Sequence, residues 1–427
     1  MTATDRVGSP RRARTDQLTT VWLVAALVTM GVGLAARGAL PQPLWTSIHV
    51  VTLGVLTNGI LQWSWYFARA LLHLPAGDRR SGRDNVTRAV AFNGALVGLV
   101  ASMWAASVWG TVAFAGAVGA VIAWHGLALL RAARTRLASR FAVVIRYYVA
   151  AAAFLVAGCV LAGFLTVAMF AGGAPGWLVA ARDDLTVAHA VVNVGRWVGL
   201  SMAGTLVTLG PTVLRTRMDP QAVEGAMRAL PILVAGVAVA GTAGAFGWLP
   251  GVGVGLLAFG AALAFGVAAP LVRAGRSRGV RGYAAWTVTA GLGWAAVGFA
   301  AVAVNAFVAP DSTALRTADL PWLAVLGAGG LAQVFVGALT YLMPVVIGGG
   351  PGTVRRGIAV LETAGPLRVA LRNTALLLLA ATVPSDGSLA PLWWALVLAC
   401  FAADVAAFAV AGARQARARR GDDWSER

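Results

Sequence analysis

The segment Asp183–Arg217, DDLTVAHAVVNVGRWVGLSMAGTLVTLGPTVLRTR, combines the length of a membrane-spanning helix with a stripe of polar side chains. Within it, His189, Asn193 and Arg196 fall at positions i, i+4 and i+7, which lie on one face of a helix. Polar and ionisable groups inside a membrane are costly, so they normally face the interior of a helix bundle or a water-filled cavity. We therefore expect this stripe to face other helices and to mark the functional site.

The composition of the whole chain is that of an integral membrane protein. Of its 427 residues, 59% are hydrophobic and 12% are charged, and the mean hydropathy is +0.77, whereas about 25% of residues in soluble domains are charged. Apolar segments long enough to span a bilayer begin near Gln17, Pro43, Arg88, Thr111, Phe141, Asp183, Ala229, Leu249, Tyr283, Leu320, Leu367 and Pro391. We predict an all-α bundle of about 12 transmembrane helices over residues 17–413, between an Arg-rich arm (1–16) and a basic tail (414–427).

The arginines of this chain predict its topology. If the N-terminus is cytoplasmic, 27 of the 34 basic residues, all of them arginine, fall in cytoplasmic tails and loops. The loops on the other side then hold only Arg37, Arg182 and Arg316. This asymmetry follows the positive-inside rule and predicts that both termini are cytoplasmic. Because topology accounts for the formal charge of +18, we do not expect the protein to bind nucleic acid.

The expected location is the plasma membrane of a bacterium. The chain is rich in Arg, Ala and Gly and has no Lys, which is typical of a GC-rich bacterial genome. The first apolar segment continues past the length of a signal-peptide core, so we expect no cleavage there and a multi-pass protein that keeps its first span in the lipid bilayer.

A second histidine is predicted to lie level with His189. The segment Pro43–Leu72 runs from the outer to the inner side, which places His49 about 9 Å below its outer end at about 1.5 Å per residue. His189, six residues past Asp183, has a similar depth from the same side. Two such histidines could share a heme iron or another metal, since imidazole suits iron, copper and zinc. The alternative is a pair of neutral histidines, each hydrogen-bonded inside a packed bundle.

Other polar residues of the predicted spans also need partners. Arg196 lies roughly 20 Å from the outer end of its helix, and Asp404, on the last span, has the same expected depth, so we predict an ion pair between them. Asn58 and Gln62 are expected to hydrogen-bond to a neighbouring helix. His125 lies near the cytoplasmic end of its span and is expected to be interfacial, with a second site as the alternative.

Three segments carry a family resemblance: HVVTLGVLTNGILQWSWYFARALL (49–72), AHAVVNVGRWVGL (188–200) and FVGALTYLMPVVIGGGP (335–351). They resemble the multispanning membrane domain that precedes the cupredoxin modules of certain actinobacterial copper oxidases, which are similar to copper nitrite reductases. More distantly, the pattern is similar to NnrS-like membrane proteins of nitric-oxide stress and to heme-copper oxidase subunit I. The resemblance implies that His49 is an iron ligand, that His189 is a heme or copper ligand, and that a separate cupredoxin-type protein is the redox partner.

The chain also departs from these families. Heme-copper oxidases carry further histidines, including one on the tenth helix, where this chain has Trp322, and only four histidines are present in total. A complete heme-copper oxygen-reducing site is therefore excluded. Three hypotheses remain: a heme- or copper-binding membrane subunit linked to copper or nitrogen-oxide redox chemistry, a transporter in which Arg196 binds a small anionic solute, and a structural subunit without a ligand.

Overall fold

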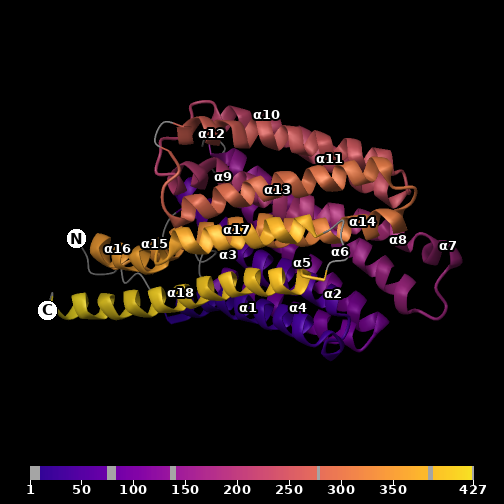
Figure 1. The fold of residues 1–427 in the computed structure, drawn as a ribbon, viewed down its shortest axis with the longest axis horizontal. Coiled ribbons are helices and arrows are strands. Elements are labelled where there is room, and N and C mark those ends of the chain that lie inside the picture. Colours follow the sequence, from indigo (N-terminus) through magenta and orange to yellow (C-terminus); the bar gives the residue numbers. More distant parts are fainter. Residues whose placement is uncertain (1–9, 75–82, 135–140, 277–278, 383–387, 426–427) are drawn as a thin grey trace.

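The computed structural model describes residues 10–74, 83–134, 141–276, 279–382 and 388–425, and over these ranges the chain is helical with no strand. The long helices lie along one common axis (Figure 1). The first half comprises α1 (Pro10–Ala35), η1 (Arg37–Ala39), α2 (Pro43–His49), η2 (Val50–Thr57), α3 (Asn58–Leu71), α4 (Arg83–Trp104), α5 (Val108–Arg134), α6 (Ala142–Phe170), α7 (Gly176–Ala180), α8 (Arg182–Ala190), η4 (Val191–Val198) and α9 (Gly199–Val213). The second half comprises α10 (Ala222–Ala245), α11 (Leu249–Leu263), η5 (Ala264–Ala268), α12 (Ala269–Arg276), α13 (Tyr283–Val308), α14 (Ser312–Ala324), η6 (Val325–Ala332), α15 (Gln333–Ile347), α16 (Gly350–Leu361), α17 (Gly365–Ala381) and α18 (Ala390–Ser425).

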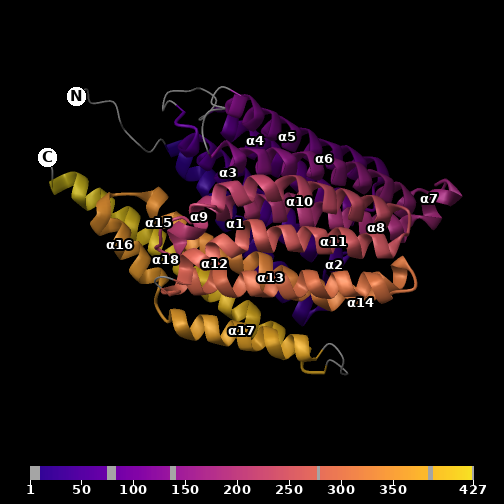
Figure 2. The same cartoon turned by 90° about the horizontal axis from the view of Figure 1, so that it is seen from above.

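The predicted all-α membrane bundle is confirmed. Within the described residues, 11 helices are long and apolar enough to cross a membrane, where the sequence predicts about 12. The remaining predicted span, from near Leu367, is α17, which has only 17 residues. It packs against α13 and α18 and lies at the opposite edge of the bundle from α4 and α5 (Figure 2). The protein is therefore an integral membrane protein whose eleventh predicted span is a short helix.

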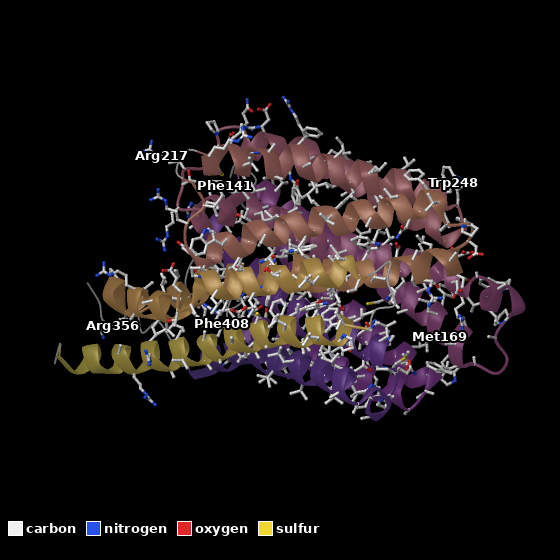
Figure 3. All side chains as sticks on the ribbon, viewed as in Figure 1. Phe141, Met169, Arg217, Trp248, Arg356 and Phe408 are labelled. Carbon is white, nitrogen blue, oxygen red and sulfur yellow. The ribbon has the colours of Figure 1, made fainter. Side chains whose placement is uncertain are left out.

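Two arginines that the predicted topology places on the same side of the membrane lie at the same end of the bundle. Arg217 and Arg356 lie at one end, and Trp248 and Met169 lie at the other (Figure 3). The sequence places both of these arginines in cytoplasmic loops, so their shared end agrees with an even number of crossings between them. Which side of a membrane this end faces, and the cytoplasmic position of both termini, stay predictions.

The predicted boundaries of the terminal segments do not coincide with breaks in the helices. Helix α1 already begins at Pro10, inside the predicted arm, and α18 runs on through the predicted basic tail to Ser425. In that tail, the buried amide of Gln415 donates to the carbonyls of Pro344 and Gly348, at 2.6 and 3.0 Å. The start of the predicted tail is therefore packed on the end of α15.

Small residues allow the closest helix contacts. At the crossing of α10 and α11, a Cβ on Gly255 would lie 2.2 Å from the carbonyl oxygen of Gly236. Only glycine lets the two backbones approach this closely, which is how membrane helices commonly pack without large side chains. This pair of helices supports the helix α8 and the π-helical segment η4, because α10 contacts both.

Several spans contain π-helical segments, in which backbone hydrogen bonds join residues five positions apart in place of four. The segment η2 follows His49 directly, η4 begins two residues after His189, and η6 interrupts the span that contains α15. In η2, the hydroxyl of Thr57 donates to the carbonyl of Thr52, five residues earlier, at 2.8 Å. π-helical segments are rare in proteins, and those that do occur are frequently found at functional sites.

Candidate metal centre

The structure brings His49 and His189 together from two different spans. His49 is the last residue of α2, and His189 is the penultimate residue of α8. Their ring centroids are 6.3 Å apart, and the ring planes are inclined by only 28°. The expectation that the two histidines lie at one level on two helices is confirmed, and a single small ligand can contact both rings.

Hydrogen bonds to the backbone fix which ring nitrogen of each histidine is available. Nδ1 of His49 lies 2.8 Å from the carbonyl oxygen of Trp45, and Nδ1 of His189 lies 3.1 Å from that of Gly158. A carbonyl oxygen only accepts, so Nδ1 carries the hydrogen in both neutral rings, and Nε2 keeps its lone pair. Metal-binding histidines almost always hold their second nitrogen in this way. Both histidines are therefore in the tautomer whose Nε2 carries a lone pair; at His189 this nitrogen also lies 3.2 Å from Nδ2 of Asn193, so a metal that binds there displaces that amide.

Neighbouring side chains restrict the two rings further. The indole of Trp45 stacks on His49, with centroids 4.1 Å apart and planes 19° apart. On the other side, Nδ2 of Asn193 lies 3.2 Å from each ring nitrogen of His189. The amide oxygen of Asn193 is buried and has no hydrogen-bond partner. This oxygen packs against Gly158 of α6.

Gly158 is the point on α6 against which this side of the site packs. Its carbonyl accepts the hydrogen bond from His189, and a Cβ at this position would lie 1.9 Å from Oδ1 of Asn193. No real side chain tolerates such a contact. The place of Asn193 beside the histidine therefore depends on glycine at position 158.

A buried hydrogen bond holds the two histidine-bearing spans together. The indole nitrogen of Trp197 in η4 donates to the hydroxyl of Thr57 in η2, at 2.8 Å. Trp197 is 2% exposed and Thr57 is fully buried, so water does not compete for this bond. The bond lies two turns further along both spans than the histidines and keeps η2 and η4 in register.

The polar stripe predicted around His189 is only partly described. Asn193 contacts His189, as the spacing of four residues predicts. Arg196 lies in η4, and its side chain lies outside the described residues. The segment η4 packs mainly on α6, α9 and α10, whereas α18, which carries Asp404, packs mainly on α1, α16 and α17.

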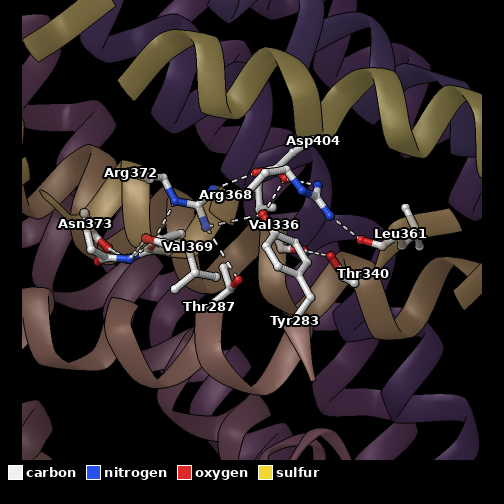
Figure 4. A network of polar contacts seen from close by, with 12 residues as sticks. Tyr283, Thr287, Val336, Thr340, Leu361, Arg368, Val369, Arg372, Asn373 and Asp404 are labelled. Carbon is white, nitrogen blue, oxygen red and sulfur yellow. Dashed lines mark hydrogen bonds and ion pairs between the residues drawn. The ribbon is translucent and has the colours of Figure 1, made fainter. Parts of the chain in front are cut away.

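The described partners of Asp404 are two arginines that the prediction from sequence did not assign to it. Its carboxylate is bonded by Arg368 (Nη1 to Oδ1, 2.5 Å) and Arg372 (Nη1 to Oδ2, 2.6 Å), both on α17 (Figure 4). The hydroxyl of Tyr283 donates to Oδ1 as well. The predicted pairing with Arg196 stays a prediction, because the side chain of Arg196 lies outside the described residues.

The network around Asp404 extends to a second set of polar groups. Nε of Arg372 donates to Oε1 of Gln333 at 2.7 Å, and Gln333 exchanges hydrogen bonds of 3.2 Å with Asn373. The guanidinium of Arg368 lies 3.9 Å from the ring centroid of Tyr283. Sequence reasoning missed this network, although the spacing of Arg368 and Arg372, four residues apart beside one deep carboxylate, is a signal for it.

Two arginines that the sequence assigns to the cytoplasmic side are buried. Arg368 is one of them, and Arg88 in α4 is the other, with 2% of its surface exposed. The guanidinium of Arg88 lies 4.8 Å from the ring of Trp65. His125, expected at the interface, is also buried, and its Nε2 lies 2.8 Å from the hydroxyl of Ser64. Hydropathy alone places both arginines in the headgroup region. In the structure, aromatic rings cover their guanidinium groups and make their burial less costly.

The interhelical role of the polar residues on the second span is confirmed. The amides of Asn58 and Asn93 bond to each other, at 2.8 and 3.2 Å, and the hydroxyl of Thr19 donates to Gln62 at 3.2 Å. These contacts tie α3 to α4 and α1. They place the span that carries His49 firmly within the bundle.

The histidine pair is a two-ligand site. Among the described residues, no group of three or more His, Cys, Asp or Glu side chains could hold a metal ion. Two imidazoles suffice where a porphyrin supplies the other four ligands of iron, and imidazole is also a ligand of copper. The residues present therefore fit heme iron or a copper ion better than a structural zinc ion, which needs about four protein ligands.

Comparisons with known proteins give no relative for this chain. A scan against models of known protein families finds no match, and a search of curated proteins finds no similar sequence. The resemblance to copper-oxidase membrane domains therefore stays a prediction, and the functional argument depends on the geometry of the site.

Proposed function

We propose that His49 and His189 together would hold a redox-active metal, a heme iron or a copper ion, inside the membrane. The observation that carries this proposal is the pair of neighbouring rings, with centroids 6.3 Å apart, whose Nδ1 atoms are both engaged by backbone carbonyls. Metal-binding histidines almost always donate their second N–H in this way, which leaves Nε2 as the nitrogen that would bind the metal.

The surrounding residues suit a centre that exchanges electrons without large rearrangement. Trp45 holds the plane of the His49 ring, and the Trp197–Thr57 bond holds the two spans in register. Asn193 contacts the ring of His189 from the other side and packs against Gly158. Bound iron or copper would supply one-electron redox chemistry at this position.

The depth of the site supports a proposal about where a redox partner would bind. His49 lies at the end of α2, only six residues after Pro43, and Arg182 begins the helix of His189. Both histidines are thus near the end of the bundle that the topology places outside the cytoplasm. This position favours electron exchange with a separate cupredoxin-type protein on the outer side, in copper or nitrogen-oxide redox chemistry, as the family resemblance implies.

Absorption spectroscopy tests the redox role. The detergent-purified protein should show a visible spectrum that changes reversibly between its ferricyanide-oxidised and dithionite-reduced forms. The change should be lost in His49→Ala and His189→Ala, and it should be retained in His73→Ala, which removes an exposed histidine outside the site. A metal-free protein without this change would contradict the proposal and leave the transport and structural hypotheses.

A further inference from the structure

A second site lies at the arginine-rich end of the bundle, away from the histidine pair. A cavity of about 730 Å³ opens between the end of α9, α15 and α16. Arg215, Arg355, Tyr341 and Glu362 contribute its polar wall, and Ile358 contributes to its apolar wall. The neighbours of these arginines in the sequence, Arg217 and Arg356, lie at the same end of the molecule (Figure 3).

The charges around this cavity are not balanced. Arg215 is 3.5 Å from the carboxylate of Glu362, which orients its guanidinium at the rim. In the part of the chain that the structure describes, Arg355 has no carboxylate within ion-pair distance. The wall therefore contains two guanidinium groups and one carboxylate, and the cavity has an excess positive charge that suits an anion.

The backbone at Arg215 turns the chain at the end of α9 and brings this residue to the wall of the cavity. This residue has φ of 53°, in the left-handed region, directly after the C-cap Leu214. The amides of Arg215 and Thr216 donate to the carbonyls of Thr212 and Pro211, which is a common way to end a helix.

A neutral donor completes the polar wall. The side chain of Tyr341, on α15, lines the cavity, and its hydroxyl has no hydrogen-bond partner among the described residues. A phosphate oxygen is an acceptor for both this hydroxyl and the guanidinium of Arg355. Ile358 and Ala359 line the same space and can contact the acyl chains of a lipid.

We propose that this cavity binds the phosphate group of an anionic phospholipid. The chemistry recognised is a phosphate ester, and its source is the membrane leaflet because the cavity lies at the end of a membrane bundle and has a partly apolar wall. Basic pockets between transmembrane helices on the cytoplasmic side are suited to such headgroups. This site is independent of the proposed metal centre.

Native mass spectrometry and thermal melting in nanodiscs test the proposal with phosphatidylglycerol as the probe and phosphatidylcholine as the neutral comparison. Wild-type protein should retain phosphatidylglycerol with an apparent affinity about 10-fold higher than phosphatidylcholine, equivalent to about 1.4 kcal/mol. Arg355→Gln should remove most of this preference. Arg356→Gln is the matched control, since it removes an exposed arginine next in the sequence that does not line the cavity, and it should keep the preference.

Three results would overturn the proposal. Equal retention of the two lipids would show that the cavity does not select anionic headgroups. An equal loss in Arg355→Gln and Arg356→Gln would show a general effect of surface charge. Stabilisation by inorganic phosphate alone that matches phosphatidylglycerol would show a soluble phosphate ligand in place of a lipid. Melting of each variant in phosphatidylcholine should equal that of wild type, which controls for folding.

Discussion

Replacing Asp404 with asparagine should be among the most destabilising conservative changes in this protein. Both oxygens of the carboxylate are bonded, to Arg368 and Tyr283 on one side and to Arg372 on the other. The side chains of Arg372 and Asp404 are at most 1% exposed. Asp404→Asn keeps the size of the side chain but leaves two buried guanidinium groups without a counter-charge.

The expected magnitude follows from the burial of the ion pair. Removing one partner of a buried pair typically costs about 3–5 kcal/mol, because the remaining charge is buried without compensation. Two arginines depend on Asp404, so we expect the free energy of unfolding to fall by about 3 kcal/mol or more. Equilibrium unfolding of the purified protein in mixed micelles, followed by circular dichroism, measures the change.

A surface pair provides the control for this experiment. Glu224 pairs with Arg228 one helical turn away, with both side chains more than half exposed. Glu224→Gln should change stability by less than about 1 kcal/mol. Adding Arg368→Gln to Asp404→Asn should recover part of the loss, since it removes one uncompensated charge. A loss below about 0.5 kcal/mol for Asp404→Asn would refute the reasoning, because surface substitutions produce changes of that size.

Two further predictions concern the site and the pH dependence of stability. Gly158→Ala should reduce metal content at least several-fold, because the new Cβ meets Asn193 beside His189, whereas Gly163→Ala on the same helix, with no atom within 4 Å of the new Cβ, should leave metal content unchanged; metal analysis of both variants checks this. Burial raises the pKa of Asp319, in α14 before the span, to about 6, partly offset by a hydrogen bond from Asn305. The folded state therefore binds this proton more tightly than the unfolded state, so the contribution of Asp319 to stability should be greatest below about pH 4 and be lost as the pH rises through about 6. Asp319→Asn should remove this loss, which we expect to be about 2 kcal/mol between pH 4.5 and 7.5, and melting curves over this range on both proteins would show it; parallel curves would contradict it.

The sequence predicts the membrane fold because hydropathy reports which segments can lie in lipid. The placement of the arginines in turn predicts on which side each loop lies. It also predicts that His49 and His189 lie at one level, because depth along a helix follows from residue number. Depth does not say which helices are neighbours, so it predicts neither the contact between the two histidines nor the bonds from Arg368 and Arg372 to Asp404. The neighbour of a span depends on packing that apolar sequence scarcely encodes.

The local backbone was also beyond sequence reasoning. The π-helical segments η2 and η4 have no compositional signature, yet each follows a histidine of the site and changes the direction of the side chains after it. The role of Gly158 was equally hidden, because a glycine in an apolar span shows its purpose only when the facing side chain, here Asn193, is known.

The central claim is that His49 and His189 bind one metal jointly, and the metal content of purified variants tests it most directly. Elemental analysis and heme extraction of wild-type protein should give about one iron, as heme, or one copper per chain, by the two-ligand geometry of the site. His49→Ala and His189→Ala should each lose most of it, and His73→Ala should retain it. Retention of the metal in both single variants, or a folded wild-type protein without iron or copper, would contradict the account.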